Sequence, residues 1–140
     1  MSHVDTIEVE ITDLNALRAA VKESGCLWLA KNTYEWYGHH VGDYPIPKGM
    51  TKEKLGQCDY VIQLPGCKYE IGVVKMPNGK WTLAYDFWGE GRKLLEKFGD
   101  KLGKLVQLYG VHRATMLAKK QGMKVHRMVQ SNGSIQLTLV

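Results

Sequence analysis

The 140-residue sequence contains no apolar run close to the ~20 residues that a membrane-spanning helix needs. Its first residues, Met1 to Asp5, lack the basic start and apolar block of a secretory signal peptide, so we expect a cytoplasmic protein. The three cysteines, Cys26, Cys58 and Cys67, form an odd count without CxxC spacing, and we interpret them as reduced thiols. A Gly-rich phosphate loop, an RNA-binding aromatic signature and a zinc finger are all missing.

Acidic residues are scarce after residue 90. Residues 91–140 carry ten Lys or Arg against two Asp or Glu, whereas residues 1–90 carry nine against twelve. A segment with this excess of positive charge attracts polyanions, acidic protein surfaces or anionic lipid heads. The alternative interpretation is that these charges only keep a helix face soluble.

Composition and periodicity predict one globular domain, residues 1–140. Apolar residues make up 44% of the chain and charged residues 24%, which is ordinary for a folded protein. Apolar alternation predicts strands, and apolar residues at helical spacing predict helices. We expect strands at residues 6–11, 26–30, 34–37, 59–64, 68–75, 80–87, 123–129 and 134–140, and helices at residues 14–24, 92–98 and 101–121, the last one weakened at Gly103 and Gly110.

Strands that are separated from helices in this way predict an α+β fold. We expect a largely antiparallel sheet of about six to eight strands, with two or three helices packed on one face. A long ordered loop is expected at residues 38–57, with one turn of helix at residues 51–55. Connections of this length are usually functional or mobile.

The stretch from residue 34 to residue 47 is the densest in side chains that bind other molecules. Its aromatic rings suit a stacking platform for bases, a pocket for a ligand ring, or a hot spot for a protein partner. The alternative is that several of them are core residues that close one end of the sheet. The candidate partner-binding residues are Tyr34, Trp36, Tyr37, His39, His40, Asp43 and Tyr44.

Catalysis or metal binding is a further hypothesis for the same region. His39, His40 and Asp43 are types that bind metals or transfer protons, and Cys58 or Cys67 is of a type that could in principle complete a zinc site. Adjacent histidines on an extended chain point in opposite directions, which disfavours one shared metal. Asp86, at a strand end among aromatic residues, is either a general base or a cap for the following turn. No recognisable motif supports catalysis, so we assign no catalytic residue, metal or cofactor.

A basic face is expected on the C-terminal helices. Residues 93, 97, 101 and 104 would lie near one face of a helix, which is compatible with a phosphate backbone and also with an ordinary solvated face. The candidate nucleic-acid contacts are Lys93, Lys97, Lys101, Lys104, Arg113, Lys119, Lys120, Lys124 and Arg127, with Arg92 beside them.

Several short patterns together carry a family resemblance. They are the Met-Ser-His opening, the aromatic run at residues 36–38, the Val-Gly-Asp-Tyr-Pro run at residues 41–45, and the tail with Tyr109, Ala114, Ala118, Gly122 and an Asn-Gly-Ser-Ile-Gln-Leu ending. With these features the chain resembles the uncharacterised family known as chloroplast hypothetical reading frame thirty-five, and residues 36–47 look closest to its phage-type members. The resemblance implies an α+β fold and no established activity. It also implies an accessory role beside an AAA-type ATPase, and a location in the host cytoplasm if the protein is encoded by a phage.

Three functional hypotheses follow from these patterns. The first is a non-catalytic binding or adaptor protein that acts with other proteins through the aromatic loop. The second is a nucleic-acid-binding protein that uses the basic C-terminal face, with Tyr37 and Tyr44 stacking on bases. The third is an enzyme or metal-binding protein that uses His39, His40, Asp43 or Asp86.

Overall fold

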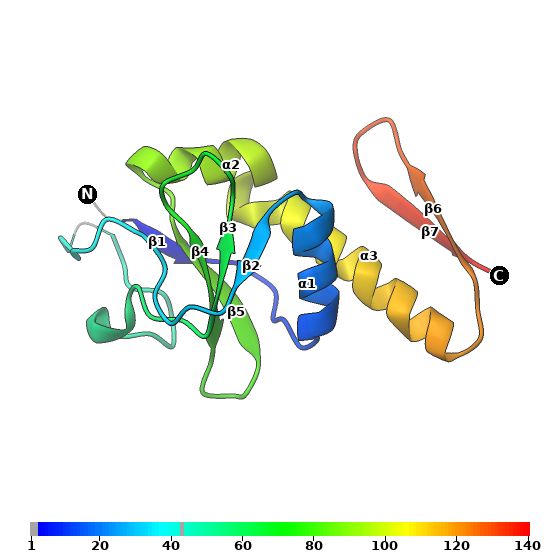
Figure 1. Cartoon of the computed structure of the whole chain (residues 1–140), viewed down its shortest axis with the longest axis horizontal. Helices are drawn as coiled ribbons and strands as arrows, with labels where there is room; N and C mark the ends of the chain where they lie inside the picture. The colour runs from blue at the N-terminus through cyan, green and yellow to red at the C-terminus, as the bar shows by residue number, and fades with distance from the viewer. Residues whose placement is uncertain (1–2, 43) are drawn as a thin grey trace.

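The structure is a computed structural model that describes residues 3–42 and 44–140. In this part of the chain seven strands and three α-helices occur, joined by three short 3₁₀ turns (Figure 1). In chain order they are β1 (Val4–Thr6), α1 (Leu14–Glu23), β2 (Leu27–Leu29), η1 (Lys52–Lys54), β3 (Tyr60–Gln63), β4 (Ile71–Lys75), β5 (Trp81–Asp86), η2 (Gly89–Gly91), α2 (Arg92–Phe98), η3 (Asp100–Leu102), α3 (Gly103–Lys120), β6 (Val125–Val129) and β7 (Ile135–Leu139).

Five strands form the main sheet, in the order β1-β5-β4-β3-β2, and every pairing in it is antiparallel. The α+β prediction is therefore confirmed. The remaining two strands, β6 and β7, form a separate sheet of their own. The seven strands thus fall into two sheets, because the long helix α3 carries the last hairpin away from the first sheet (Figure 1).

The helices cover one face of the main sheet. Helix α1 begins where the carboxylate of Asp13 accepts a hydrogen bond from the Ala16 amide at 3.1 Å, as the capping pattern predicts. Its buried side packs on the sheet together with side chains of α2 and α3. This main core contains Leu17, Ala20, Val21, Ile62, Ile71, Leu83, Leu94, Phe98 and Leu105, among others.

The other face of the sheet is covered by the segment that was expected to be a strand and a loop. Residues 34–37 are not a strand; apart from an isolated bridge between Thr33 and Gln57, this part of the segment is irregular. The ring of Tyr34 instead packs against Gly72, where an added Cβ would approach the ring to 2.2 Å. Tyr34 and Leu55 are buried there in a second core. The sheet is therefore sandwiched between a helical layer and a layer of ordered loop.

The helical region after residue 90 is interrupted at η3. Lys101 and Leu102 have φ angles of +55°, which is rare for residues other than glycine and ends any continuous helix there. The expected helix at residues 101–121 therefore begins only at Gly103, and it continues through Gly110 to Lys120. As a result, the predicted stripe at residues 93, 97, 101 and 104 does not lie on one helix.

Candidate functional site

The aromatic segment is held in place by two buried carboxylates. Asp86 is fully buried at the end of β5, and its oxygens accept hydrogen bonds from the backbone amides of His3, Tyr37 and Trp88, each at 3.1 Å. A carboxylate that accepts three amide bonds without access to solvent acts as an organiser of the backbone. Asp86 therefore caps the following turn, which is one of the two roles predicted for it.

Glu70 has the same role one strand away. It is 1% exposed, and its carboxylate accepts hydrogen bonds from Lys31 Nζ, the Glu35 amide and Gln63 Nε2, at 3.0, 3.0 and 3.2 Å. The Glu70 amide in turn donates to the Glu35 carbonyl at 2.9 Å. The backbone of residue 35 is thus fixed just before β4, and that of residue 37 is fixed at the end of β5, which accounts for their irregular conformation.

The predicted aromatic candidates are consequently distributed between core and surface. Tyr34 is buried and burial raises the pKa of its hydroxyl to about 12, while Trp36 is half-buried against the second core. Tyr44 is half-buried too, with its ring against those of His3 and Phe87. Only Tyr37, at 42%, exposes a large part of its ring, and its neighbour there is the exposed His39.

The structure brings no metal site together in the part of the chain that it describes. No group of three or more His, Cys, Asp or Glu side chains converges among those residues. His39 is exposed and His40 half-buried, whereas Asp43 lies outside the described residues. Burial raises the pKa of Cys58 to about 12 and also raises that of Cys67, so neither thiol is primed to lose its proton.

The predicted basic contacts also divide into two groups. Lys101 pairs with Asp5 at 2.7 Å, Arg127 with Glu23 at 2.8 Å and Lys93 with Glu90 at 3.8 Å. Arg92 lies over the ring of Trp88. The other candidates are exposed and, within the described chain, form no ion pair: Lys97, Lys104, Arg113, Lys119, Lys120 and Lys124.

The most distinctive surface is one that sequence reasoning did not single out. We call residues 111–140, the second half of α3 with the β6–β7 hairpin, the arm, and residues 3–110 the body. The hairpin leans on α3 and extends beyond the main sheet (Figure 1). Strand alternation places five apolar residues on one face, with Arg127 among them opposite Leu137: Val125, Val129, Ile135, Leu137 and Leu139.

Helix α3 covers only part of that apolar face. Val129 stays 66% exposed and Leu139 49% exposed. An isolated two-stranded hairpin is at best marginally stable in water, and large apolar side chains left open together commonly mark an interaction site. The alternating pattern at residues 134–140 predicted the strand correctly, but the distance of the hairpin from the core was not readable from it.

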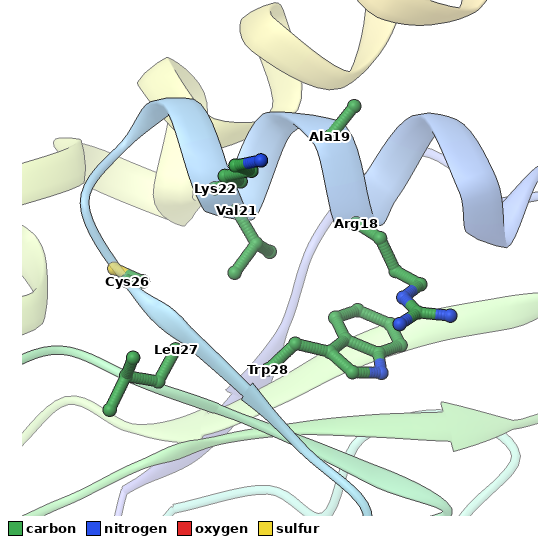
Figure 2. Close-up of a pocket in the computed structure, with 7 residues that line it drawn as sticks. All are labelled: Arg18, Ala19, Val21, Lys22, Cys26, Leu27 and Trp28. Carbon is green, nitrogen blue, oxygen red and sulfur yellow. The ribbon is translucent and has the colours of Figure 1, made fainter.

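A second unanticipated feature is a hollow between α1 and β2, with a volume of about 350 Å³. Figure 2 shows Arg18 extending from α1 beside the indole of Trp28, with Val21 pointing toward the strand. The guanidinium carbon of Arg18 lies 5.7 Å from the ring centroid. Of the described residues that line the hollow, two are cationic and none is acidic: Arg18, Ala19, Val21, Lys22, Cys26, Leu27 and Trp28.

Comparisons of the chain with protein-family models, curated proteins and solved structures gave no match. The resemblance to the family called chloroplast hypothetical reading frame thirty-five therefore stays a prediction. None of the described helices has both the length and the apolar character required to cross a membrane. Inference about function rests on the geometry above.

Proposed function

We propose that the protein is a non-catalytic binding protein that recognises another protein through its arm. The observation that carries this proposal is the apolar face of the β6–β7 hairpin, which α3 leaves half uncovered. The first hypothesis, an accessory or adaptor protein, is thereby retained, and its main recognition surface moves from the aromatic loop to the arm. The loop has a structural role because its rings and backbone complete the second layer of the body.

The chemistry of the arm supports a role in binding. Val129 and Leu139 expose branched apolar groups at the two ends of the hairpin face, and Leu117 and Val140 are also about half exposed or more. Burying a side chain of this size contributes about 1.5–3 kcal/mol. In the free chain Val129 is 66% and Leu139 49% exposed, so the part of this energy that belongs to their exposed surface is available to a complex.

Affinity purification from native lysate of the source cells, with and without nuclease, tests the proposal. The bait is the wild-type chain, the arm variant Val129→Glu/Leu139→Glu, or the control Val9→Glu/Val41→Glu, which places the same charges on exposed valines of the body. We expect nuclease-resistant proteins with the wild type and the control, and their loss with the arm variant. Recovery of the same proteins with all three baits, or of none after nuclease, would contradict the proposal.

The family resemblance extends the proposal to a particular class of partner. It would make an AAA-type ATPase the protein that the arm contacts, in the host cytoplasm if the source is a phage. Identification of an ATPase subunit among the nuclease-resistant proteins supports this extension. A set of specific partners that contains no ATPase overturns the extension and leaves the arm proposal intact.

Nucleic-acid binding is the second candidate, and a separate observation favours it. Residues 101–140 contain seven Lys or Arg and no Asp or Glu. A salt titration of binding to a fluorescent 20-base-pair duplex measures the number of phosphate contacts, since each contact contributes about −0.9 to the slope of log K against log salt. We expect Lys119→Gln/Lys120→Gln/Lys124→Gln to flatten the slope by about two to three and Lys52→Gln/Lys54→Gln to leave it unchanged. A slope near zero for the wild type would remove this candidate.

A further inference from the structure

The outer edge of the main sheet is open at β2. This strand is the last in the sheet order, and it pairs on one side with β3 through Leu27, Trp28 and Leu29. In the described part of the chain, no backbone group of these three residues bonds to any element other than β3. The outward amide and carbonyl groups of an edge strand are a template for one more strand.

The hollow in Figure 2 adjoins this strand on the side of α1, where the Cys26 amide donates to the Val21 carbonyl at 3.1 Å and Arg18 lies over Trp28. An added strand would therefore lie beside β2, with the hollow next to it. A strand added here would lie about 4.8 Å from β2, and its alternate side chains would face α1 about 6.6 Å apart. On that side the lining exposes the cations Arg18 and Lys22, four positions apart on α1, while Val21 and Cys26 form its buried apolar floor. The lining therefore suits a carboxylate that lies close to an apolar side chain.

From these features we propose that the groove between β2 and α1 binds an extended peptide segment of a partner protein by strand addition. The segment carries an apolar residue at one position and a carboxylate two residues away. The charge of the groove is what selects this occupant, because its lining offers two cations and no acidic group to an incoming chain.

Strand addition supplies affinity through the backbone, and the pocket supplies specificity through alternate side chains. Arg18 is already positioned over Trp28, so part of the cost of ordering its side chain is met before the ligand arrives. This site lies on the body, and its existence does not depend on the role proposed for the arm.

The test uses three fluorescein-labelled peptides. The first is Val-Thr-Glu-Thr-Val-Thr-Glu, which places valine and glutamate on one face of a strand. The second has lysine in place of glutamate. The third is the first peptide methylated at every backbone amide nitrogen, so that it keeps both side-chain faces and its backbone cannot donate hydrogen bonds. Fluorescence anisotropy gives the affinities, and NMR chemical shifts of the protein amides give the location.

We expect the acidic peptide to bind at least tenfold more tightly than the other two, with shifts centred on Leu27–Leu29 and α1. The variant Arg18→Glu/Lys22→Glu weakens this binding at least tenfold, and the control Lys52→Glu/Lys54→Glu, with the same change of charge in η1, does not. Equal affinity for the three peptides, shifts centred on the arm, or no saturation below ~1 mM would overturn the inference. The arm variant Val129→Glu/Leu139→Glu should bind the acidic peptide normally, which separates this test from that of the proposed function.

Discussion

The body and the arm solve the problem of burying apolar side chains in opposite ways. In the body, both faces of the sheet are covered, by helices on one side and by the described residues of the segments 30–42 and 44–58 on the other. In the arm, a two-stranded hairpin leans on half of one helix, and Val129 and Leu139 stay open to solvent. The buried polar groups of the body therefore stabilise its fold, whereas the exposed apolar groups of the arm remain available to a partner.

The difference extends to charge. In the body, the buried carboxylates Glu70 and Asp86 each accept three hydrogen bonds and organise the second layer. The arm contains no carboxylate, and Glu23 at the end of α1 accepts bonds from both His112 and Arg127, at 2.7 and 2.8 Å. Among the described residues this is the one ion-paired link from the body to the hairpin.

The largest expected effect comes from Asp86→Ala. Removal of the carboxylate leaves three buried backbone amides without an acceptor, and we expect the body to lose about 3 kcal/mol or more of unfolding free energy. Urea denaturation monitored by tryptophan fluorescence measures the loss. The control is Asp59→Ala, which removes an exposed carboxylate with one amide bond at 3.2 Å. Equal losses for the two variants would contradict the organising role of Asp86.

Gly72→Ala tests the packing of the loop layer. The new Cβ collides with the ring of Tyr34, so we expect a loss of about 1–3 kcal/mol. Combination with Tyr34→Leu should recover part of that loss, which a double-mutant cycle in urea detects. Gly110→Ala is the control, because no atom lies within 4 Å of its added Cβ, and it should stabilise α3 by about 0.5–1 kcal/mol. Additive effects of Gly72→Ala and Tyr34→Leu would argue against the ring contact.

Much of this architecture was readable from local sequence, and the part that was not depends on distant partners. The cap at Asp13, the end of α1 at Gly25 and the Asn78-Gly79 turn each follow from residues next to one another. Residues 34–37 have strand-like composition, yet Glu35 and Tyr37 bond to carboxylates 35 and 49 positions further along the chain. No periodicity encodes such bonds.

Contacts between residues that are distant in the sequence also explain why the predicted surfaces differ from the observed ones. The interruption at Lys101 and Leu102 occurs without glycine at either position, while Lys101 reaches Asp5 at 2.7 Å and Leu102 is fully buried. The groove between β2 and α1 joins residues that the sequence analysis assigned to separate elements. Arg18 and Lys22 lie four positions apart in the sequence, which places them on one helix face. This spacing points to a binding site only once β2 is known to be an edge strand.

Glu23→Gln should have a small effect that is confined to the arm. Hydrogen bonds from Arg127 and, less strongly, from His112 hold the pKa of Glu23 below its ordinary value of 4.5, although partial burial opposes them. A lowered carboxyl pKa contributes stability above the ordinary value and loses it as the pH falls through the lowered one. We therefore expect the hairpin amides of the wild type to shift in NMR spectra as the pH falls through this lowered pKa, and those of Glu23→Gln to show no such acid-dependent shift.

Glu23→Gln should lower the unfolding free energy by less than about 1 kcal/mol, as is typical when a solvent-exposed ion pair is lost. Glu53→Gln in η1 is the control, since Glu53 is exposed and has no ion pair in the described chain. An acid-dependent shift of the hairpin amides that survives in Glu23→Gln would assign the titration to another group.

The smallest expected change is in the stability of the arm variants. Val129→Lys and Leu139→Lys should each alter unfolding free energy by less than about 0.5 kcal/mol, because their side chains are largely exposed already. Leu83→Ala in the main core, by contrast, should cost about 2–5 kcal/mol. Thermal unfolding compares the three. Losses of similar size would mean that the arm is part of the core.

Hydrogen exchange of the free protein directly tests the claim that the β6–β7 hairpin of the arm lacks a core of its own and opens independently of the body. The amides of β6 and β7 should exchange at least 100-fold faster than those of β3, β4 and β5, because the hairpin opens locally while the sheet opens only with the whole fold. Exchange of the hairpin at the same rate as the sheet would contradict the claim, because it would show that the arm and the body unfold as one unit.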